Sequence, residues 1–273
     1  MVIKMAETEF NKISLTALCA DICGCMGVEP PKSAERSGGA LTALCKEKKC
    51  DRIVMYNPDA QAEWLVKKYP EIFGKVTSRS HVTIDFATVM PSVTPVCFAT
   101  MYTGASPEVH GIKRYEKPVL TCDTIFDAMI RAGKKCAIVA TEGCSIAHIF
   151  LGRDMDYYII PAEAVADENA VKKGIELINS DAYDLVVIYN GMYDSVMHAT
   201  FPESEMAMEW LHHHTMAYER IYEAAKAVSE SKGHRTLIGY ATDHGVHTNA
   251  YGRGAHGEYI PEDINIRHFY DIV

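Results

Sequence analysis

Apolar positions along the chain fall into short continuous runs separated by longer stretches with helical spacing. Segments 184–189 (Asp-Leu-Val-Val-Ile-Tyr) and 236–241 (Thr-Leu-Ile-Gly-Tyr-Ala) are short, apolar and rich in β-branched or aromatic residues, which is typical of central parallel strands. Segments 52–56 and 136–140 have the same character. We therefore predict that these four segments are strands of one buried sheet.

Helical spacing predicts the segments that connect these strands. Helices are expected from about residue 60, over 123–133, over 163–179 and over the long stretch 204–231. Because strands that alternate with helices build α/β folds, we predict a doubly wound, mostly parallel central sheet with helices on both faces.

The N-terminal part of the chain has a different pattern. It predicts helices over 12–26 and 40–48 around a break at 29–39 whose prolines and glycines oppose regular structure. No candidate chemistry lies there. We expect a single domain over residues 1–273 with a helical N-terminal extension at about 1–50.

Charge and hydropathy restrict the class of partner. The formal net charge of -9 argues against nucleic acid or an anionic membrane, because both attract a basic surface. The chain has no long apolar run, and its first residues lack the pattern of a secretory signal. We therefore expect a cytoplasmic protein whose partner is a small molecule, with no nucleic-acid polymer and no membrane.

The nine cysteines are odd in number and scattered, which fits reduced thiols better than a disulfide framework. The alternative is a metal or iron-sulfur site, and hence a redox protein, built from Cys19, Cys23, Cys25, Cys45 and Cys50. Their spacings contain no C-x2-C pair, and their neighbours are apolar. We expect most of them to be small buried side chains.

Three short clusters contain residue types that bind metal ions. They are Asp194-Ser-Val-Met-His198, Asp243-His244-Gly and His256-Gly. The first two follow predicted strands, beyond whose carboxyl ends α/β sheets bind ligands. The third lies in a glycine-rich loop that can reach back over these ends. Two carboxylates and three imidazoles exceed the three protein ligands of a catalytic zinc, so their number indicates two metal ions in one crevice.

Local geometry allows these side chains to converge. Asp194 and His198 lie four residues apart, so on a helix they point to one side. Asp243 and His244 are adjacent and would point to opposite faces of a strand, but Gly245 lets the chain leave the strand. Each pair alone also fits a helix-capping aspartate or a core histidine; the whole set is harder to explain that way.

Thr94 is the candidate nucleophile. It precedes Pro95, and residues 96–102 can form a short helix, so we predict Thr94 at the N-cap with proline at the first helical position. Its hydroxyl would lie in positive potential, and free backbone N–H groups would face a bound anion. A threonine that only caps the helix fits the same segment.

Several motifs occur in a fixed order: Pro91-Ser-Val-Thr94, then residues 103–112, Asp194-x3-His198, Asp243-His244-Gly and His256-Gly. In order and spacing they resemble the alkaline phosphatase superfamily, specifically its nucleotide pyrophosphatase/phosphodiesterase branch. The resemblance covers the chain from about residue 50 onward. It implies a metal-dependent hydrolase of phosphate esters.

The resemblance also implies the ligand sets. One metal ion would be held by Asp194, His198 and His256, and the other by Asp59, Asp243, His244 and the Thr94 oxygen. The family usually has Asp-Gly after the first core strand, where this chain offers Asn57 or Asp59. We choose Asp59, because a carboxylate suits a hard divalent cation better than an amide does.

The chemistry implied by the resemblance is a two-step displacement. Two ions clamp the attacking and leaving oxygens, Thr94 attacks phosphorus, and the resulting phospho-threonine is hydrolysed. Zinc suits the histidine-rich set, and manganese is a second candidate where carboxylates dominate.

Departures from the family pattern affect the substrate. Where this branch has an asparagine after His-Gly-Ile, this chain has Lys113, Arg114 and Tyr115, with Tyr115 at the matching spacing. These three residues are candidates for substrate binding, and the alternative is a surface loop. Cys97 lacks the downstream arginine of sulfatases, which disfavours that activity.

The remaining histidines are assigned lesser roles. His212, His213 and His214 lie on a predicted helix and are expected to be structural or solvated. His247 is close enough to the ligands to orient one of them or to contact substrate. His110 is expected to fix its loop.

The leading hypothesis is a two-metal phosphodiesterase or phosphatase. The alternatives are a non-catalytic domain that binds metal or a phospho-ligand, and a phosphomutase-like phosphotransferase. The chain leaves no room between the motifs for the large cap domain of the superfamily's phosphosugar and phosphoglycerate mutases.

Overall fold

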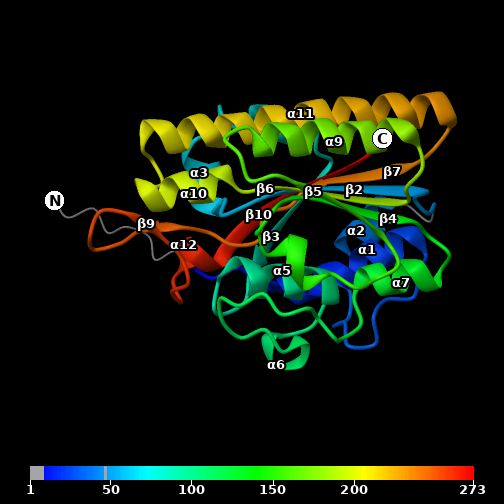
Figure 1. Cartoon of the computed structure of the whole chain (residues 1–273), viewed down its shortest axis with the longest axis horizontal. Coiled ribbons are helices and arrows are strands. Elements are labelled where there is room, and N and C mark those ends of the chain that lie inside the picture. The colour runs from blue at the N-terminus through cyan, green and yellow to red at the C-terminus, as the bar shows by residue number, and fades with distance from the viewer. Residues whose placement is uncertain (1–8, 46–47) are drawn as a thin grey trace.

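A computed structural model describes residues 9–45 and 48–273. In these ranges a sheet of eight strands lies between two layers of helices (Figure 1). The strands are β1 (Ile13–Ser14), β2 (Arg52–Pro58), β3 (Val82–Ala87), β4 (Cys136–Thr141), β5 (Asp156–Ile160), β6 (Leu185–Asn190), β7 (Thr236–Tyr240) and β10 (Asn265–Ile272). Their order is β1-β3-β10-β7-β2-β6-β4-β5, and only β10 runs antiparallel to its neighbours. The predicted doubly wound, mostly parallel α/β fold is confirmed.

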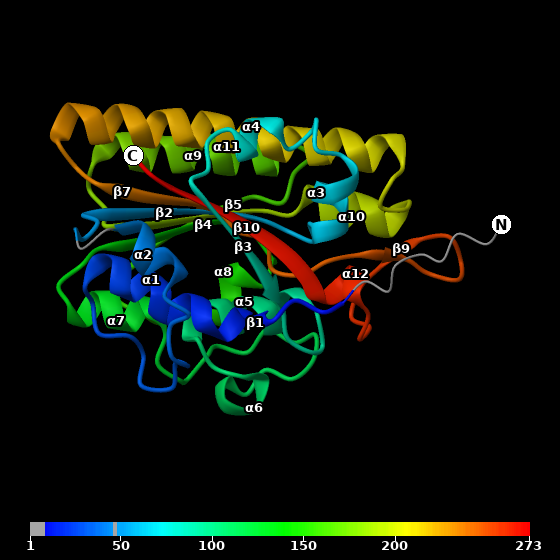
Figure 2. The same cartoon turned by 180° about the vertical axis from the view of Figure 1, so that it is seen from behind.

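Helices cover both faces of the sheet, as the two opposite views show (Figures 1 and 2). One layer contains α3 (Glu63–Lys68), α4 (Gly74–Thr77), α9 (Ala166–Ser180), α10 (Met192–Ala199) and α11 (Glu205–Lys232). The other contains α1 (Leu18–Met26), α2 (Ala40–Cys45), α5 (Thr94–Thr103), α6 (Pro107–His110), α7 (Ile125–Arg131) and α8 (Ile146–Ile149). The short α12 (Pro261–Ile264) and the hairpin of β8 (His247–Thr248) and β9 (Gly254–Ala255) lie at one end of the sheet.

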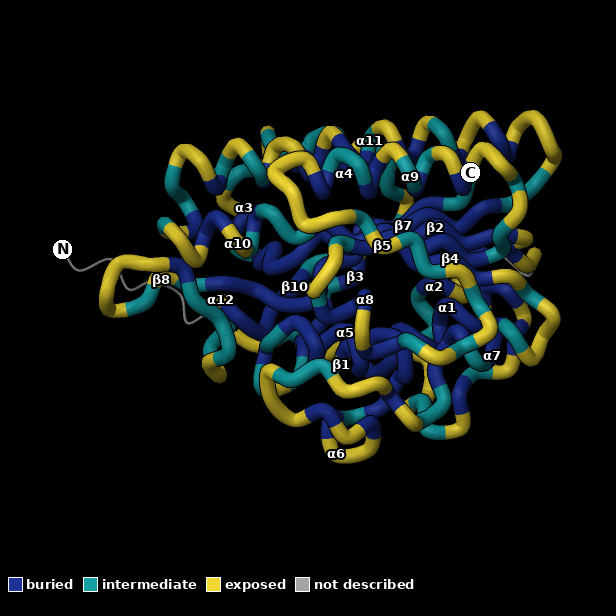
Figure 3. Tube along the Cα trace, viewed as in Figure 1, coloured by how far each residue is buried: buried dark blue, intermediate teal, exposed yellow. Residues whose placement is uncertain are grey.

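The central strands are apolar along their whole length because each face packs against a helical layer. In β2, Ile53 and Met55 belong to the core under α1 and α5, whereas Val54 and Tyr56 belong to the core under α9 and α11. Figure 3 shows these strands buried while the outer turns of α11 are exposed. A strand buried on both faces reads as a continuous apolar run, which is why the pattern predicted it.

Four strands of this sheet were not predicted, namely β3, β5 and β10, and β1 in the N-terminal segment. β3 and β10 carry polar residues that pair across the antiparallel ladder, and Arg267 Nε donates to Asp85 Oδ1 at 2.6 Å. β5 lies at the edge of the sheet and is partly exposed. Because polar side chains in these strands find partners or solvent, they show no continuous apolar run.

The N-terminal segment differs from the prediction mainly at its start. Residues 13–14 form strand β1, which pairs with β3, and a short 3-10 turn (Leu15–Ala17) precedes α1. The predicted 12–26 helix is therefore shorter. The predicted 40–48 helix is α2 at 40–45, and residues 46–47 lie outside the described part of the chain.

All nine cysteines are free thiols, and seven of them are buried. The sulfurs of Cys45 and Cys50 lie 3.9 Å apart, which is too far for a disulfide bond. Among the described residues, no cysteine belongs to a group that could hold a metal ion. This geometry agrees with the expected core role and gives no support to an iron-sulfur centre. In the same ranges no helix is both long enough and apolar enough to span a membrane.

Candidate metal centre

Three neighbouring parallel strands bring the predicted ligand segments to one edge of the sheet. β2 pairs with both β6 and β7, so the carboxyl ends of the three strands lie side by side. Asp59 follows β2, α10 follows β6, and the Asp243-His244 pair follows β7. The order of the sheet therefore assembles residues that are far apart in sequence.

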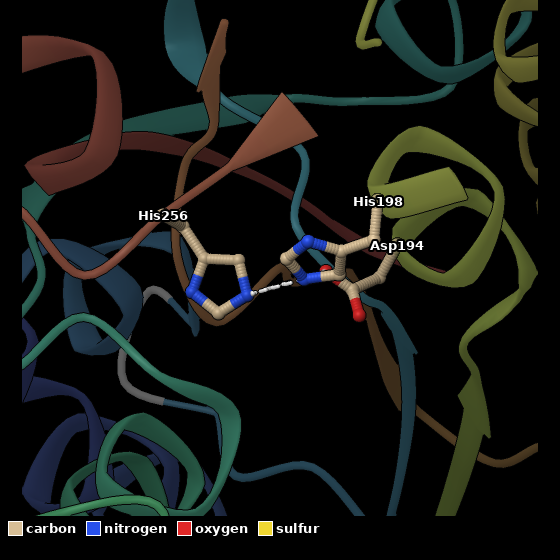
Figure 4. Close-up of side chains that lie close together, drawn as sticks. All are labelled: Asp194, His198 and His256. Atoms are coloured by element: carbon tan, nitrogen blue, oxygen red, sulfur yellow. Dashed lines mark hydrogen bonds and ion pairs between the residues drawn. The ribbon is translucent and has the colours of Figure 1, made fainter. Parts of the chain in front are cut away.

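The first cluster consists of Asp194, His198 and His256 (Figure 4). The two Nε2 atoms of His198 and His256 face each other at 3.0 Å. Asp194 Oδ1 lies 3.4 Å from each of them. Ligand atoms that surround a tetrahedral zinc at 2.0–2.1 Å are about 3.3 Å apart, so these three atoms have the spacing of a zinc site.

Backbone carbonyls determine which nitrogen of each ring is free. His198 Nδ1 donates to the Gly254 oxygen at 3.1 Å, and His256 Nδ1 donates to the Ser92 oxygen at 2.8 Å. Because a carbonyl can only accept, each Nδ1 carries a hydrogen, and Nε2 is the nitrogen of each ring that can bind a metal ion. Two ring nitrogens that face each other at this distance need a positive charge between them, either a proton or a metal ion.

The second cluster consists of Asp59, Asp243 and His244, with the Thr94 hydroxyl beside them. His244 Nε2 lies 3.4 Å from Asp59 Oδ1, 3.3 Å from Asp243 Oδ2 and 3.3 Å from Thr94 Oγ1. His244 Nδ1 donates to the Gly245 carbonyl at 3.0 Å, which leaves Nε2 as the free nitrogen. The rings of His244 and His256 stack at 4.0 Å, so the two clusters are adjacent.

Three carboxylate oxygens in the clusters are buried without a hydrogen-bond partner: Asp59 Oδ1, Asp194 Oδ1 and Asp243 Oδ2. In contrast, the Tyr189 hydroxyl donates to Asp59 Oδ2, and the Ala60 N–H donates to Asp243 Oδ1 at 3.2 Å. Buried carboxylate oxygens without partners are costly, and divalent cations satisfy them. The residues present therefore fit a pair of metal ions.

The acidic ligands have strongly perturbed pKa values. Burial, reinforced by Asp243 and Asp194, raises the pKa of Asp59 well above its usual range. Burial likewise raises the pKa of Asp243 to about 7, with Asp194 adding to the shift. For Asp194, burial is outweighed by His198 and His256, so its pKa lies below the usual range.

The second cluster's histidine is held in its neutral form. Burial, followed by the neighbouring His256, lowers the pKa of His244 well below its ordinary value. A neutral imidazole with a free Nε2 is the form that binds metal. His244 therefore offers a free lone pair to a cation beside the carboxylates of Asp59 and Asp243.

Two glycines permit close backbone approach at the clusters. A Cβ on Gly245 would lie 2.0 Å from the Glu262 oxygen, so the position needs glycine for space rather than for the flexibility that the sequence suggested. A Cβ on Gly254 would lie 2.4 Å from the Met197 oxygen. The close contact of β9 with α10 is what places the Gly254 carbonyl against His198.

Thr94 differs from its predicted position by one residue. It is the first residue of α5, and Val93 is the N-cap. Val96 and Cys97 both donate their N–H groups to the Val93 oxygen at 3.0 Å, and Pro95 has none. The start of α5 therefore has fewer free backbone N–H groups for an anion than the sequence predicted. The Thr94 hydroxyl faces the second cluster, where its oxygen lies 3.3 Å from His244 Nε2.

The structure distinguishes between Asn57 and Asp59. The Asn57 amide donates to the Ala241 oxygen at 2.6 Å, and its Oδ1 accepts from the Tyr102 hydroxyl at 2.5 Å. Asn57 is therefore fully engaged outside the clusters. Asp59 reaches them because Ala60, at φ 60, turns the chain directly after β2. The same turn delays the predicted helix at 60, which begins at Glu63 as α3.

In the part of the chain that the structure describes, the three candidate substrate residues are bonded only within their own loop. Lys113, Arg114 and Tyr115 are exposed, and Arg114 pairs with Glu116 at 2.8 Å. Lys117 Nζ lies 5.3 Å from the centre of the Tyr115 ring. No hydrogen bond or ion pair among the described residues joins positions 113–115 to either cluster. Their role in substrate binding stays a prediction.

His110 has the loop-fixing contacts that were expected. Its Nε2 lies 3.0 Å from Thr100 Oγ1, and its Nδ1 accepts from the Ile112 N–H at 3.2 Å. His247 bonds Asp263 at 2.8 Å rather than a metal-ligand candidate.

The three consecutive histidines of α11 divide as the helical spacing implies. His212 and His213 are exposed, whereas His214 is buried. His214 Nδ1 lies 2.8 Å from the Tyr56 hydroxyl, and its Nε2 accepts from the Tyr193 N–H at 3.3 Å. These contacts agree with structural or solvated roles.

Sequence reasoning missed three residues that support the clusters. Tyr189 holds Asp59, Ser92 holds the His256 loop, and Asp167 accepts from the N–H groups of Gly191 and Met192 at the start of α10. The local sequence does not indicate these roles. A tyrosine is common inside an apolar strand, and an aspartate is common in the first turn of a helix.

Replacing Tyr189 with phenylalanine is expected to weaken metal binding about 10–100-fold, because Asp59 loses the donor that orients it. Competition with a chromophoric chelator measures this affinity. Tyr183→Phe is the matched control, since Tyr183 also donates to a carboxylate, Asp156, away from the clusters. Equal metal affinity in the two variants would contradict the positioning role of Tyr189.

No protein-family model matches the chain, and no curated protein matches it in sequence. Solved structures match its fold. An inactive threonine-to-alanine variant of murine ectonucleotide pyrophosphatase/phosphodiesterase 5, in complex with AMP, is 17% identical with a TM-score of 0.57, over 73% of this chain and 58% of that one. The human protein of the same name is 18% identical with a TM-score of 0.55, over 73% and 58%.

A bacterial structure matches over a similar range. Phosphonoacetate hydrolase from Sinorhizobium meliloti 1021, in complex with phosphonoformate, is 16% identical with a TM-score of 0.51, over 72% of this chain and 57% of that one. The chain thus spans less than two thirds of these structures. At such identities the likeness concerns the fold, and at that level it confirms the resemblance that the motifs predicted.

Proposed function

From this shared fold and from the two clusters, we propose that the chain is a metal-dependent hydrolase of phosphate esters, of the phosphodiesterase or phosphatase type. Two divalent ions, zinc in the first cluster and zinc or manganese in the second, are the proposed cofactors. The alternative is a domain that binds metal or a phospho-ligand without turnover, and an assay of turnover distinguishes the two functions.

One observation carries the proposal. Three buried carboxylate oxygens without partners, Asp59 Oδ1, Asp194 Oδ1 and Asp243 Oδ2, converge with three imidazole Nε2 atoms at the carboxyl ends of adjacent strands. Such an arrangement is unfavourable without cations. Its two groups share one edge of the sheet, as a two-metal hydrolase requires.

The proposed ligand roles follow the clusters. Asp194, His198 and His256 hold one ion, and Asp59, Asp243, His244 and Thr94 hold the other. Bound ions would lower the pKa of the Thr94 hydroxyl and balance negative charge on the phosphoryl group. Hydrogen bonds orient the ligands of the second cluster. Tyr189 orients Asp59, and backbone groups orient Asp243 and His244.

Thr94 is the proposed nucleophile. Its oxygen bonds to phosphorus while the bond from phosphorus to the leaving oxygen breaks. The hydroxyl proton is released to solvent, and the leaving oxygen takes up a proton from solvent. The product of this step is a phospho-threonine and a free alcohol. Water then attacks phosphorus, which restores the Thr94 hydroxyl and releases phosphate or a monoester.

The substrate class is a small phosphate ester. The murine phosphodiesterase structure contains AMP and the bacterial hydrolase contains phosphonoformate, so both neighbours bind compact phosphorus-containing anions. We propose that Lys113, Arg114 and Tyr115, which form an exposed basic and aromatic segment, contact the substrate. Their charge suits a phosphate ester.

Metal analysis combined with a substrate panel tests the proposal. The protein as isolated is expected to contain two divalent ions and to hydrolyse at least one of an aryl phosphate monoester and an aryl phosphate diester. Two bound ions without turnover of any compound would favour the binding domain. Absence of bound metal, after supplementation with zinc and manganese, would contradict both functions.

Replacing His256 with alanine is expected to reduce the metal content from two ions to one, because the first cluster keeps only two ligands. His212→Ala, a change to an exposed histidine of α11, is the matched control and is expected to retain both ions. Elemental analysis of the dialysed proteins gives the ratio. An unchanged ratio in His256→Ala would remove this residue from the ligand set.

A further inference from the structure

A cavity of about 280 Å³ lies between α9 and α11, and the proposed hydrolase activity assigns no role to it. The two helices run side by side on one face of the sheet (Figures 1 and 2). Tyr56 of β2 and Asn190 of β6 also line the cavity, so it extends from the helical layer to the sheet.

The mouth of this cavity has exposed apolar side chains. Val165 and Met216 line it and are 52% and 40% exposed. Trp210 lines it as well, and the centre of its ring lies 5.2 Å from that of His213. Large apolar and aromatic side chains that stay exposed around a concavity are typical of a small-molecule site.

A buried acceptor in the cavity has no partner. Asn190 is 1% exposed, and its Nδ2 donates to the Asp167 backbone oxygen at 3.0 Å. Because that carbonyl can only accept, the amide orientation is determined, and Oδ1 is the atom left without a hydrogen bond. A ligand N–H would satisfy this oxygen, whose desolvation is otherwise uncompensated.

The carboxylate and guanidinium groups that line the cavity are already satisfied. Asp167 accepts from the N–H groups of Gly191 and Met192 at 3.2 and 3.0 Å. Glu168 and Arg220 form a two-point ion pair at 2.7 and 3.1 Å. The guanidinium is therefore already paired, and both oxygens of the Asp167 carboxylate already accept hydrogen bonds, which favours a neutral ligand over an anion.

We propose that this cavity binds a neutral bicyclic aromatic heterocycle that carries an N–H donor. A dry cavity of about 150 Å³ holds benzene, so the present volume suits two fused rings. The rings lie against Trp210 and Met216, and the N–H donates to Asn190 Oδ1. The proposal is independent of the hydrolase activity, because it uses none of the proposed metal ligands and not Thr94.

Indole is the probe, because it is neutral, bicyclic and has one N–H. Titration calorimetry of the full chain is expected to give one site with a Kd of about 0.1–1 mM. 1-Methylindole, which lacks the donor, is expected to bind at least about tenfold more weakly, since Asn190 Oδ1 then stays unsatisfied. Equal affinity for the two compounds would overturn the proposal.

Variants locate the binding site. Ala217 lines the cavity and Ala224 on the same helix does not. Ala217→Leu is expected to weaken indole binding at least about tenfold by filling space, and Ala224→Leu is expected to leave it unchanged. Unchanged affinity in Ala217→Leu would reject the site. So would the absence of indole binding at 5 mM by wild-type protein, provided that this protein shows a cooperative melting transition. The melting curves of both variants establish that they are folded.

Discussion

Replacing Thr94 with alanine is expected to reduce turnover of an aryl phosphate ester by at least about 10³-fold. The change removes the oxygen that would bond to phosphorus. Thr94 Oγ1 lies 3.3 Å from His244 Nε2, but the second cluster keeps its two carboxylates and its imidazole without it. The variant is therefore expected to retain both metal ions.

The measurements are steady-state turnover and metal content of the same preparations. Thr94→Ser is the matched control, because it keeps the hydroxyl and removes only a methyl group; part of the activity should survive. If Thr94→Ala retained wild-type turnover with metal bound, the nucleophile would have to be another group. Loss of metal together with activity would instead make Thr94 a ligand whose role in the chemistry is indirect.

The second large effect concerns the metal-free protein, which is expected to lose stability as pH rises. Burial raises the pKa of Asp243 from 3.8 to about 7. Between these values the unfolded chain has released the proton while the folded chain keeps it. The folded state then binds more protons, so its stability falls by up to about 1.4 kcal/mol per pH unit in this window. Asp59, whose pKa burial also raises, adds to the loss.

Asp243→Asn isolates this contribution, because asparagine does not titrate. After treatment with a chelator, the free energies of unfolding of wild type and variant are measured in urea at pH 5, 6, 7 and 8. The stability of wild type relative to the variant is expected to fall by about 2 kcal/mol from pH 5 to pH 7. Asp156→Asn, at an exposed carboxylate, is the control and should give a flat difference. A flat difference for Asp243→Asn would show that this carboxylate is not held protonated.

Zinc should reverse the trend. Metal binding requires ionised carboxylates, so added zinc is expected to stabilise the wild-type protein more at pH 8 than at pH 5. The comparison of melting temperatures with and without zinc at both pH values checks this expectation. A larger effect at pH 5 would contradict it.

The sequence determined the central strands and most of the candidate ligands. Segments 52–56, 136–140, 184–189 and 236–241 are apolar throughout, and the sheet buries them on both faces. The Asp194-x3-His198 spacing places both side chains on one side of a helix, as observed in α10. Such features depend on local periodicity, which a single segment contains in full.

Only the tertiary structure decided which of these residues meet. Asp59 rather than Asn57 enters a cluster, because Ala60 turns the chain and Tyr102 engages the asparagine. Tyr189 supports Asp59 across 130 positions of sequence.

The local pattern also did not predict that β10 lies between β3 and β7. Polar residues of β10 form hydrogen bonds with residues on other strands, so the segment is not continuously apolar. Contacts of this kind follow from the order of strands in the sheet. The free energy of packing all the elements together sets that order, and no short segment encodes it.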